Sequence, residues 1–175
     1  MKRIAKFEKV SKEQYKKDFE VTPYMLHSND PNLALNWCYD NLQLPIRKTK
    51  GSAGYDFIAP CDLVILPHSE ALIKTGIKCQ IDEGYVLELY PRSSLGFKFN
   101  LTLANTVGII DSDYYNNENN EGHIMIKMIN HSDKTITIKK GEGYAQGLFK
   151  EFFITKDDNS TDVRVGGIGS TNSNN

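Results

Sequence analysis

Short apolar runs, separated by turn-forming residues, make up most of the chain after residue 43. Gly, Pro, Asn and Asp stand between these runs at a spacing of roughly 8–12 residues, which is typical of all-β domains. Apolar and polar residues alternate within several runs, for example at Ile124, Ile126 and Met128, so one face of each strand should be buried. The pattern predicts an all-β sandwich or barrel. We expect strands at residues 55–59, 63–66, 71–77, 85–90, 101–104, 124–129, 135–138 and 145–153.

Bulk properties exclude several classes of function. The net charge of -1 over 175 residues gives no sign of direct nucleic-acid binding. No apolar run approaches the roughly 20 residues that a membrane-spanning helix needs, and the N-terminus lacks the apolar core of a secretory signal. Cys38, Cys61 and Cys79 lack the spacing of a metal site. We therefore expect a cytoplasmic protein with reduced thiols that does not associate with membranes.

The chain divides into three parts. Residues 1–43 form an expected N-terminal arm with short helices, which packs on the core or on a partner. Ser11 and Gln14 fit a capping box for a helix that ends near Phe19, and Asp30 precedes a proline that would open a second helix. The β core is expected to cover residues 44–156. Residues 157–175 are polar and glycine-rich, as in a mobile tail.

The sequence Gly-Ile-Ile-Asp-Ser-Asp-Tyr at residues 108–114 is the strongest candidate for a chemical site. Gly108 permits a tight turn, and the two isoleucines have the character of a buried strand end. Asp111 then emerges where the strand stops, which is a common position for a catalytic or binding group. Taken alone, the segment also fits a hairpin with two solvated aspartates.

Four further clusters carry groups that suit a nucleotide. Asp56 lies inside an apolar run, where a carboxylate needs hydrogen-bond partners. An arginine and two serines at 92–94 offer a guanidinium and hydroxyls for phosphate oxygens. Asn105 belongs to the cluster at 108–114, on the strand that leads into it, and carries both a donor and an acceptor, as a base edge requires. Gln146 follows a glycine turn and could donate to a phosphate.

The last cluster is the glycine-rich tail that follows Arg164. Glycines allow the backbone to approach an anion closely, and the serine and threonine add donors. The segment lacks the lysine of a P-loop. Each of these four clusters, taken alone, also fits a solvated turn or a disordered tail. The tail cluster contains Gly166, Gly167, Ile168, Gly169, Ser170 and Thr171.

Together and in this order, the five clusters resemble the five motifs of the homotrimeric dUTPases. The resemblance covers roughly residues 44–171. The segments at 53–59 and 108–114 match almost completely, whereas the second motif carries serine where glycine is usual. The segment at 115–123 is longer than the usual turn, as in the Gram-positive bacterial and phage branch of the family.

The resemblance implies a jelly-roll-like β-barrel in which three subunits share each active site. The implied reaction converts dUTP to dUMP and pyrophosphate, by attack of water on the α-phosphorus. It keeps uracil out of DNA and supplies dUMP for thymidylate synthesis. Mg²⁺ is the implied cofactor, held through the phosphates and water without a direct protein ligand.

The resemblance also assigns roles to residues. Asp111 would activate the water, Tyr114 would pack under the deoxyribose, and Asp56 would support the site through hydrogen bonds. Arg164 would bind the γ-phosphate, and residues 166–171 would close over the nucleotide. The uracil-reading residues would be Asn105, Gly108, Ile109, Ile110 and Met125. The other phosphate-binding residues would be Arg92, Ser93, Ser94 and Gln146.

Some positions depart from the family pattern. Ile168 stands where an aromatic ring usually covers the base, and Gly143 stands where arginine is common. One alternative is a dCTP deaminase of the same fold, although that relative uses a glutamate near the hairpin. Another is a phage-type dUTPase that also binds a repressor as a regulatory partner. The surfaces expected for such a partner are the N-terminal arm and residues 115–122.

Overall fold

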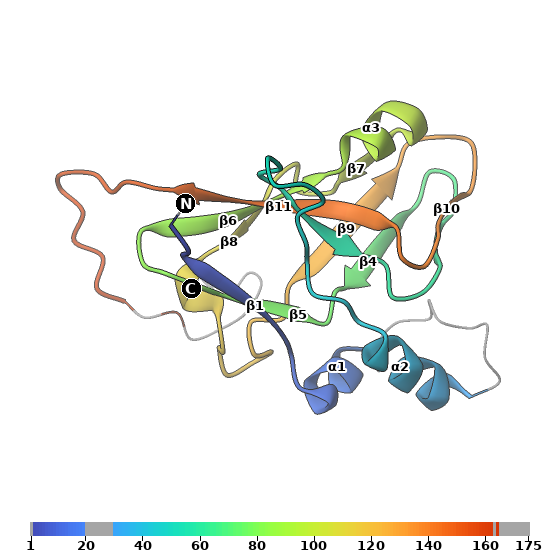
Figure 1. Cartoon of the computed structure of the whole chain (residues 1–175), viewed down its shortest axis with the longest axis horizontal. Coiled ribbons are helices and arrows are strands. Elements are labelled where there is room, and N and C mark those ends of the chain that lie inside the picture. Colours follow the sequence, from blue (N-terminus) through green and yellow to red (C-terminus); the bar gives the residue numbers. More distant parts are fainter. Residues whose placement is uncertain (1, 20–29, 163, 165–175) are drawn as a thin grey trace, which may run out of the picture.

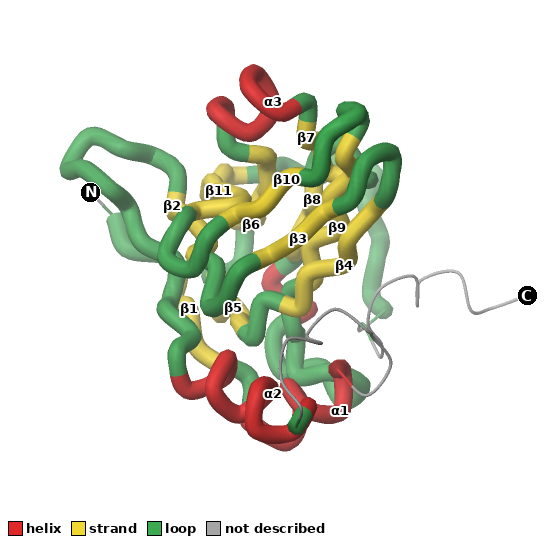
Figure 2. Tube along the Cα trace, turned by 90° about the vertical axis from the view of Figure 1, so that its right-hand side faces the viewer, coloured by secondary structure: helices red, strands yellow, loops and turns green. Residues whose placement is uncertain are grey.

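The computed structural model describes residues 2–19, 30–162 and 164. Antiparallel strands form its body; α1 and α2 lie together at one end of this body, and α3 lies at the other end (Figures 1 and 2). The helices are α1 (Lys12–Phe19), α2 (Pro31–Asp40), α3 (Ser93–Phe99) and the 3-10 turn η1 (Ser112–Tyr114). The strands are β1 (Ala5–Lys9), β2 (Tyr55–Ile58), β3 (Leu63–Ile65), β4 (Glu70–Lys74), β5 (Ile77–Ile81), β6 (Tyr85–Pro91), β7 (Leu101–Leu103), β8 (Gly108–Ile110), β9 (Met125–Asn130), β10 (Ile136–Ile138) and β11 (Gly143–Glu151).

The strands of the described residues pair in four antiparallel groups. Their orders are β2-β11-β6-β8, β4-β9-β7, β10-β3 and β1-β5. The apolar faces of all four groups enclose one core, in which Leu87, Leu101 and Met128 are fully buried. Lys127, between two buried residues of β9, faces outward, as the alternating pattern predicts. The all-β, jelly-roll-like fold expected from the sequence is confirmed. Within the described part of the chain, no helix has the length and hydropathy of a membrane span.

Several element boundaries differ from the sequence prediction. The strand expected at 71–77 is two strands, because Gly76 turns the chain with a φ of 72° between β4 and β5. The strand expected at 145–153 ends at Glu151, and Phe153 beyond it is 86% exposed. The serines predicted to lie in a turn open helix α3, with Arg92 at the N-cap.

The N-terminal segment follows its capping signals only in part. Asp30 Oδ1 accepts hydrogen bonds from the first turn of α2, and Ser11 Oγ accepts one from the Gln14 N–H at 3.0 Å, as predicted. The Ser11 N–H, however, donates to a carboxylate oxygen of Glu121 at 2.9 Å instead of to Gln14. A charged acceptor forms the stronger bond, which accounts for the difference.

Strand β1 was not expected within this arm. It pairs with β5 in the register Ala5↔Ile81 to Lys9↔Ile77, so the chain before α1 belongs to the β body. Its two lysines and its glutamate leave too few apolar residues for the sequence pattern to indicate a strand. Backbone pairing and the contact of the Phe7 ring with Phe57 hold it in place. The two rings meet edge to face at 6.0 Å between centroids.

Candidate active site

Asp111 lies at the end of β8, where the chain enters the η1 turn. Its carboxylate oxygen Oδ2 is 2.6 Å from Nη2 of Arg164, and Nε of the same arginine is 3.0 Å from Oδ1 of Asp113. The Arg164 guanidinium also lies over the Tyr114 ring, 5.7 Å from its centroid. The structure therefore brings together three of the predicted site residues. Two carboxylates share one guanidinium here, which balances part of their charge.

Tyr114 is almost entirely buried, and both hydrogen-bonding functions of its hydroxyl are engaged. The hydroxyl donates to the His123 carbonyl oxygen at 2.9 Å and accepts from Asn120 Nδ2 at 2.8 Å. Burial raises the pKa of Tyr114, while the Asn120 hydrogen bond and the charge of Arg164 oppose the shift. The phenol therefore stays protonated at neutral pH, and its ring is held in one orientation.

A second group of predicted residues surrounds an open hollow of about 640 Å³. Arg92 Nε lies 3.4 Å from Asp56 Oδ1, and Gln146 Nε2 donates to the Pro91 carbonyl at 3.1 Å. The other carboxylate oxygen of Asp56 is buried and has no hydrogen-bond partner among the described residues. Arginine, glutamine and hydroxyl groups around one concave surface suit an anionic ligand. The hollow is lined by Lys48, Ser52, Ala53, Gly54, Asp56, Tyr90, Arg92, Ser93, Gln146 and Leu148.

Two glycines make room for these side chains. A Cβ on Gly54 would lie 2.8 Å from Oε1 of Gln146. A Cβ on Gly143 would lie 3.0–3.2 Å from the Arg92 side chain, which donates to the Gly143 carbonyl at 3.1 Å. The glycine that replaces the expected arginine at 143 thus leaves space for Arg92. Sequence reasoning treated this glycine only as a departure from the family pattern.

The predicted uracil-reading hairpin is the β7–β8 turn. Asn105 is exposed at its tip, followed by Thr106 with a φ of 64°. Gly108 is needed for packing, because a Cβ there would lie 3.0 Å from the Leu89 side chain; it does not make the tight turn that we expected. Ile109 was expected to be buried and is 53% exposed, because alternate residues of β8 face away from the core. Met125 opens β9 and is half-buried.

The two groups of site residues lie far apart on one chain. Strand β6 connects the two groups. Near its start, Leu87 pairs with Ile110, the residue before Asp111, and Arg92 follows its other end. At about 3.3 Å per residue, the two groups are separated by roughly 20 Å along β6. A single chain therefore does not bring Asp111 to the hollow around Arg92. The predicted tail residues Gly166, Gly167, Ile168, Gly169, Ser170 and Thr171 lie outside the described residues.

Sequence reasoning missed the residues that hold Tyr114. Asn120 and His123 belong to the segment that was noted only for its length. Asn117 and Asn120 are buried, and Asn117 Nδ2 donates to both the Tyr114 carbonyl at 2.9 Å and the Asn120 side chain at 2.8 Å. Buried asparagines cannot be distinguished from solvated ones in a polar run, so the sequence carried no local signal for this function.

Comparison with known proteins identifies related sequences. The dUTPase family model matches residues 40–172. A deoxyuridine 5'-triphosphate nucleotidohydrolase of Lactococcus lactis is 43% identical over 132 residues, which cover 74% of this chain and 88% of that protein. A protein of the same name from Nautilia profundicola is 38% identical over 133 residues, which cover 73% of this chain and 89% of that protein.

Solved structures support the same relationship. The crystal structure of a dUTPase from Streptococcus mutans has a TM-score of 0.60 and 39% identity, covering 76% of this chain and 96% of that chain. A dUTPase from phage phi11 of S. aureus, solved with a structural Mg(II) ion, has a TM-score of 0.57 and 26% identity, covering 70% of this chain and 92% of that chain. Because the family model spans most of the chain and the Lactococcus protein is more than 30% identical over most of its length, this chain belongs to the dUTPase family.

Proposed function

We propose that this chain hydrolyses dUTP to dUMP and pyrophosphate, with Asp111 as the general base. The reaction follows from membership of the dUTPase family, whereas the roles of the individual residues are our proposal. The observation that carries it is the grouping of Asp111, Tyr114 and Arg164 at the end of β8. An ionised carboxylate at a strand end can orient a water molecule and take its proton during in-line attack on the α-phosphorus.

Recognition of the nucleoside is proposed for the face of β8 and its hairpin. The Tyr114 ring would lie under the deoxyribose, and its fixed position would leave no room for a 2′-hydroxyl. Asn105 would pair with the uracil edge, together with the backbone of residues 108–110 and Met125. The exposure of Asn105 and the half-burial of Met125 are compatible with contact to a base.

Recognition of the phosphates is proposed for the hollow and for Arg164. Arg92, Ser93 and Gln146 line the hollow, and Ser94 follows on α3. Arg164 would exchange its two carboxylate partners for the γ-phosphate when substrate binds. Arginine matches phosphate oxygens in the same forked geometry as carboxylate oxygens. The tail from 166 to 171 would then cover the nucleotide.

Mg²⁺ is part of the proposal. Among the described residues, no group of three or more His, Cys, Asp and Glu side chains could hold a metal ion. We propose that the ion is carried by the triphosphate and water, without a direct protein ligand. When bound, the ion would neutralise phosphate charge in the transition state.

A homotrimer is also proposed, because one chain separates the groups that the reaction needs together. Asp111 and the hollow around Arg92 lie roughly 20 Å apart along β6, and in-line hydrolysis requires base and phosphate contacts at one nucleotide. If a second chain supplies the hollow, both groups meet at a subunit boundary.

The general-base role is tested by Asp111→Asn, with Asp113→Asn as the matched control. Loss of a general base typically reduces kcat by about 10²–10⁴-fold. We expect a loss of this size for Asp111→Asn while a non-hydrolysable dUTP analogue still binds. Asp113 also contacts Arg164 but is not the proposed base. Its variant should therefore show a much smaller loss of kcat. Equal kcat values for the Asp111 variant and the wild type would exclude the assignment.

The shared site is tested by mixing two inactive variants, Asp111→Asn and Arg92→Ala, after unfolding and refolding them together. Mixed assemblies should recover part of the wild-type activity if the two residues reach one site from different chains. Separately refolded variants serve as the control. No recovery in assemblies that demonstrably contain both chains would contradict a site built across subunits.

Two further roles from the sequence stay predictions. A dCTP deaminase would release ammonia from dCTP, which a direct assay decides. A regulatory protein partner could dock on the surface where residues 115–122 meet the N-terminal segment, since Tyr115 hydrogen-bonds Glu8 and Glu121 hydrogen-bonds Ser11. A pull-down with and without dUTP tests that role. We also propose that the protein is cytoplasmic, as expected from its reduced thiols.

A further inference from the structure

The N-terminal segment, residues 1–39, lies outside the family match, which begins at residue 40. It nevertheless contacts the residues that hold Tyr114. We propose that this segment positions Tyr114 through His123, and thereby sets the discrimination between deoxyribose and ribose. The inference rests on the proposed role of Tyr114 under the sugar. Asp18 and His123 would be positioning residues, because neither reaches the substrate.

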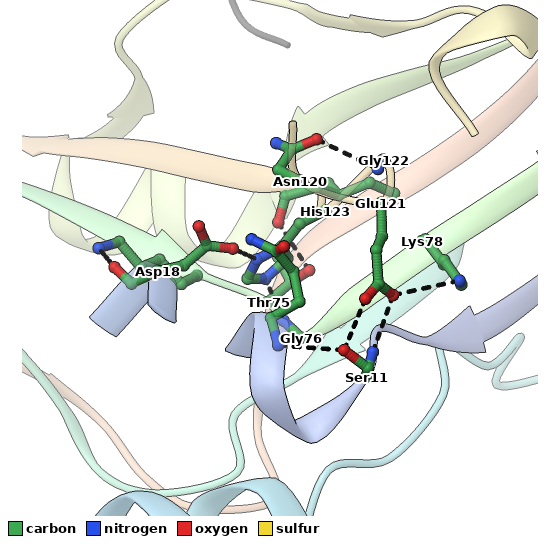
Figure 3. Close-up of polar contacts among 12 residues, drawn as sticks. Ser11, Asp18, Thr75, Gly76, Lys78, Asn120, Glu121, Gly122 and His123 are labelled. Atoms are coloured by element: carbon green, nitrogen blue, oxygen red, sulfur yellow. Dashed lines mark hydrogen bonds and ion pairs between the residues drawn. The ribbon is translucent and has the colours of Figure 1, made fainter. Parts of the chain in front are cut away.

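His123 is the centre of the connection (Figure 3). Its side chain is fully buried, with Nδ1 2.5 Å from Asp18 Oδ2 and Nε2 2.7 Å from the Gly76 nitrogen. The Gly76 N–H can only donate, so Nε2 must accept, and the ring proton of a neutral imidazole lies on Nδ1, facing Asp18. Both ring nitrogens are therefore engaged, and the orientation of the ring is fixed by α1 on one side and the β4–β5 turn on the other.

The backbone of His123 links the position of its ring to that of Tyr114. Its carbonyl oxygen accepts the Tyr114 hydroxyl at 2.9 Å, and its N–H donates to the Asn120 carbonyl at 2.9 Å. Asn120 in turn donates from Nδ2 to the Tyr114 hydroxyl at 2.8 Å. Both contacts of the phenol thus depend on the segment that His123 anchors. A shift of His123 would move the donor and the acceptor of Tyr114 together.

A second anchor lies two residues before His123. Glu121 accepts from the Ser11 N–H at 2.9 Å and from the Ser11 hydroxyl at 2.5 Å, and Lys78 Nζ is 3.4 Å from the same carboxylate (Figure 3). Gly122 lies between the two anchors with a φ of 77°, and a Cβ there would meet the Tyr114 carbonyl oxygen at 2.5 Å. The N-terminal segment therefore fixes this loop on both sides of Gly122, where the loop passes the Tyr114 carbonyl oxygen.

Position matters here because rejection of a hydroxyl is steric. A misplacement of about 1 Å can change a rate by about 10²-fold when a site depends on close geometry. A ring that blocks a 2′-hydroxyl loses its effect once it can move aside, whereas the deoxy substrate is less affected. Release of either anchor should therefore reduce selectivity more than it reduces dUTP hydrolysis.

The test compares kcat/KM for dUTP and for UTP in Asp18→Ala, Asp18→Asn and Asp40→Ala. We expect Asp18→Ala to lower the dUTP-to-UTP ratio about tenfold. Asp18→Asn keeps an oxygen acceptor for Nδ1 and should stay within about twofold of the wild type. Asp40→Ala removes an equivalent charge that pairs with Lys12 at the surface, and it should leave the ratio unchanged. General loss of stable enzyme would lower both values equally and would not move the ratio.

Tyr114→Ala, measured in the same assay, separates this inference from the proposed role on which it rests. If Tyr114→Ala leaves the ratio unchanged, the proposed role of the ring under the sugar is wrong. If Tyr114→Ala lowers the ratio and Asp18→Ala does not, the role of the N-terminal segment is overturned. Should Asp18→Ala fail to fold, Glu121→Ala releases the other anchor in its place: a lowered ratio supports the inference and an unchanged ratio overturns it.

Discussion

Gly143 shows how one missing side chain shapes the hollow. A Cβ at this position would press on the Arg92 side chain, which is paired with Asp56. The long arginine side chain can move away at little cost in stability, but then it leaves its place in the hollow. The consequence of a substitution should therefore appear in binding and not in folding.

We expect Gly143→Ala to raise KM for dUTP about tenfold or less, which corresponds to about 1.4 kcal/mol of binding free energy. kcat and Tm should change little. Gly51→Ala is the matched control, because no described atom lies within 4 Å of a Cβ added there. Steady-state kinetics and thermal melts decide the matter. An unchanged KM in Gly143→Ala would show that Arg92 does not bind phosphate from this position.

Glu121 should make folding stability depend on pH. Burial opposes its charged form, but hydrogen bonds from Ser11 and the charge of Lys78 outweigh burial and lower its pKa below the ordinary value of 4.5. A folded-state pKa below the unfolded value stabilises the fold fully above the unfolded pKa. That contribution is lost as the pH falls through the lowered pKa.

The Glu121→Gln variant should therefore have a lower Tm than the wild type at about pH 7. This difference in Tm should narrow as the pH falls below about 4. The comparison needs thermal melts of both proteins across this range. Glu83→Gln, in the exposed turn before β6, is the control, and its difference in Tm from the wild type should stay small at every pH. A Tm difference for Glu121→Gln that does not change with pH would contradict the stabilising role of the Glu121 charge.

At the scale of elements, the pairing of β6 with β8 determines where Asp111 stands. Gly108 pairs with Leu89 and Ile110 with Leu87, so the end of β8 is fixed by the middle of β6. The pairing is close because Gly108 has no side chain against Leu89. Strand β8 is three residues long, so it has little other pairing to compensate for a displacement.

We expect Gly108→Ala to lower the free energy of unfolding by about 1–3 kcal/mol, the usual effect of overpacking a core. Because Asp111 follows the same strand, kcat should fall as well. Denaturant unfolding and kinetics on the same preparation test both effects. A variant as stable as the wild type would show that the sheet relaxes around the added methyl group, and that close packing at Gly108 is not required.

For the whole molecule, large apolar side chains remain on the surface of the single chain. Phe97 on α3 is 93% exposed, and Phe153 and Ile154 beyond β11 are 86% and 71% exposed. Single exposed apolar side chains are common, but contiguous ones can mark an interface between proteins, and Phe152, Phe153 and Ile154 follow one another in the chain. Together with the separation of the site residues along β6, they support the proposed assembly of three chains.

Light scattering should give three times the chain mass of 19.8 kDa. Phe153→Ser should lower the measured mass on dilution and reduce activity in parallel, because the site needs more than one chain. Leu33→Ser, also exposed but outside the region of the family match, should leave the mass unchanged. A monomeric mass combined with full activity would contradict the assembly.

Local chemistry allowed the sequence alone to predict much of this protein. Alternation of side chains located most strands, because an apolar face must be buried whatever it packs against. The Asp30 and Ser11 caps were predictable because a cap and its helix lie within a few residues of each other. The ordered motifs, including Asp111 and Arg164, indicated the dUTPase family.

Tertiary structure decided the features that depend on residues far apart in the chain. The Asp18–His123 contact joins residues 105 positions apart, and neither has a distinctive local pattern. The partner of β1 and the exposure of Ile109 likewise depend on which strands meet, and periodicity does not specify that choice. The division of the site along β6 follows from the register with β8. Local sequence reports which face of a strand is buried, whereas only the closed fold determines which groups lie together.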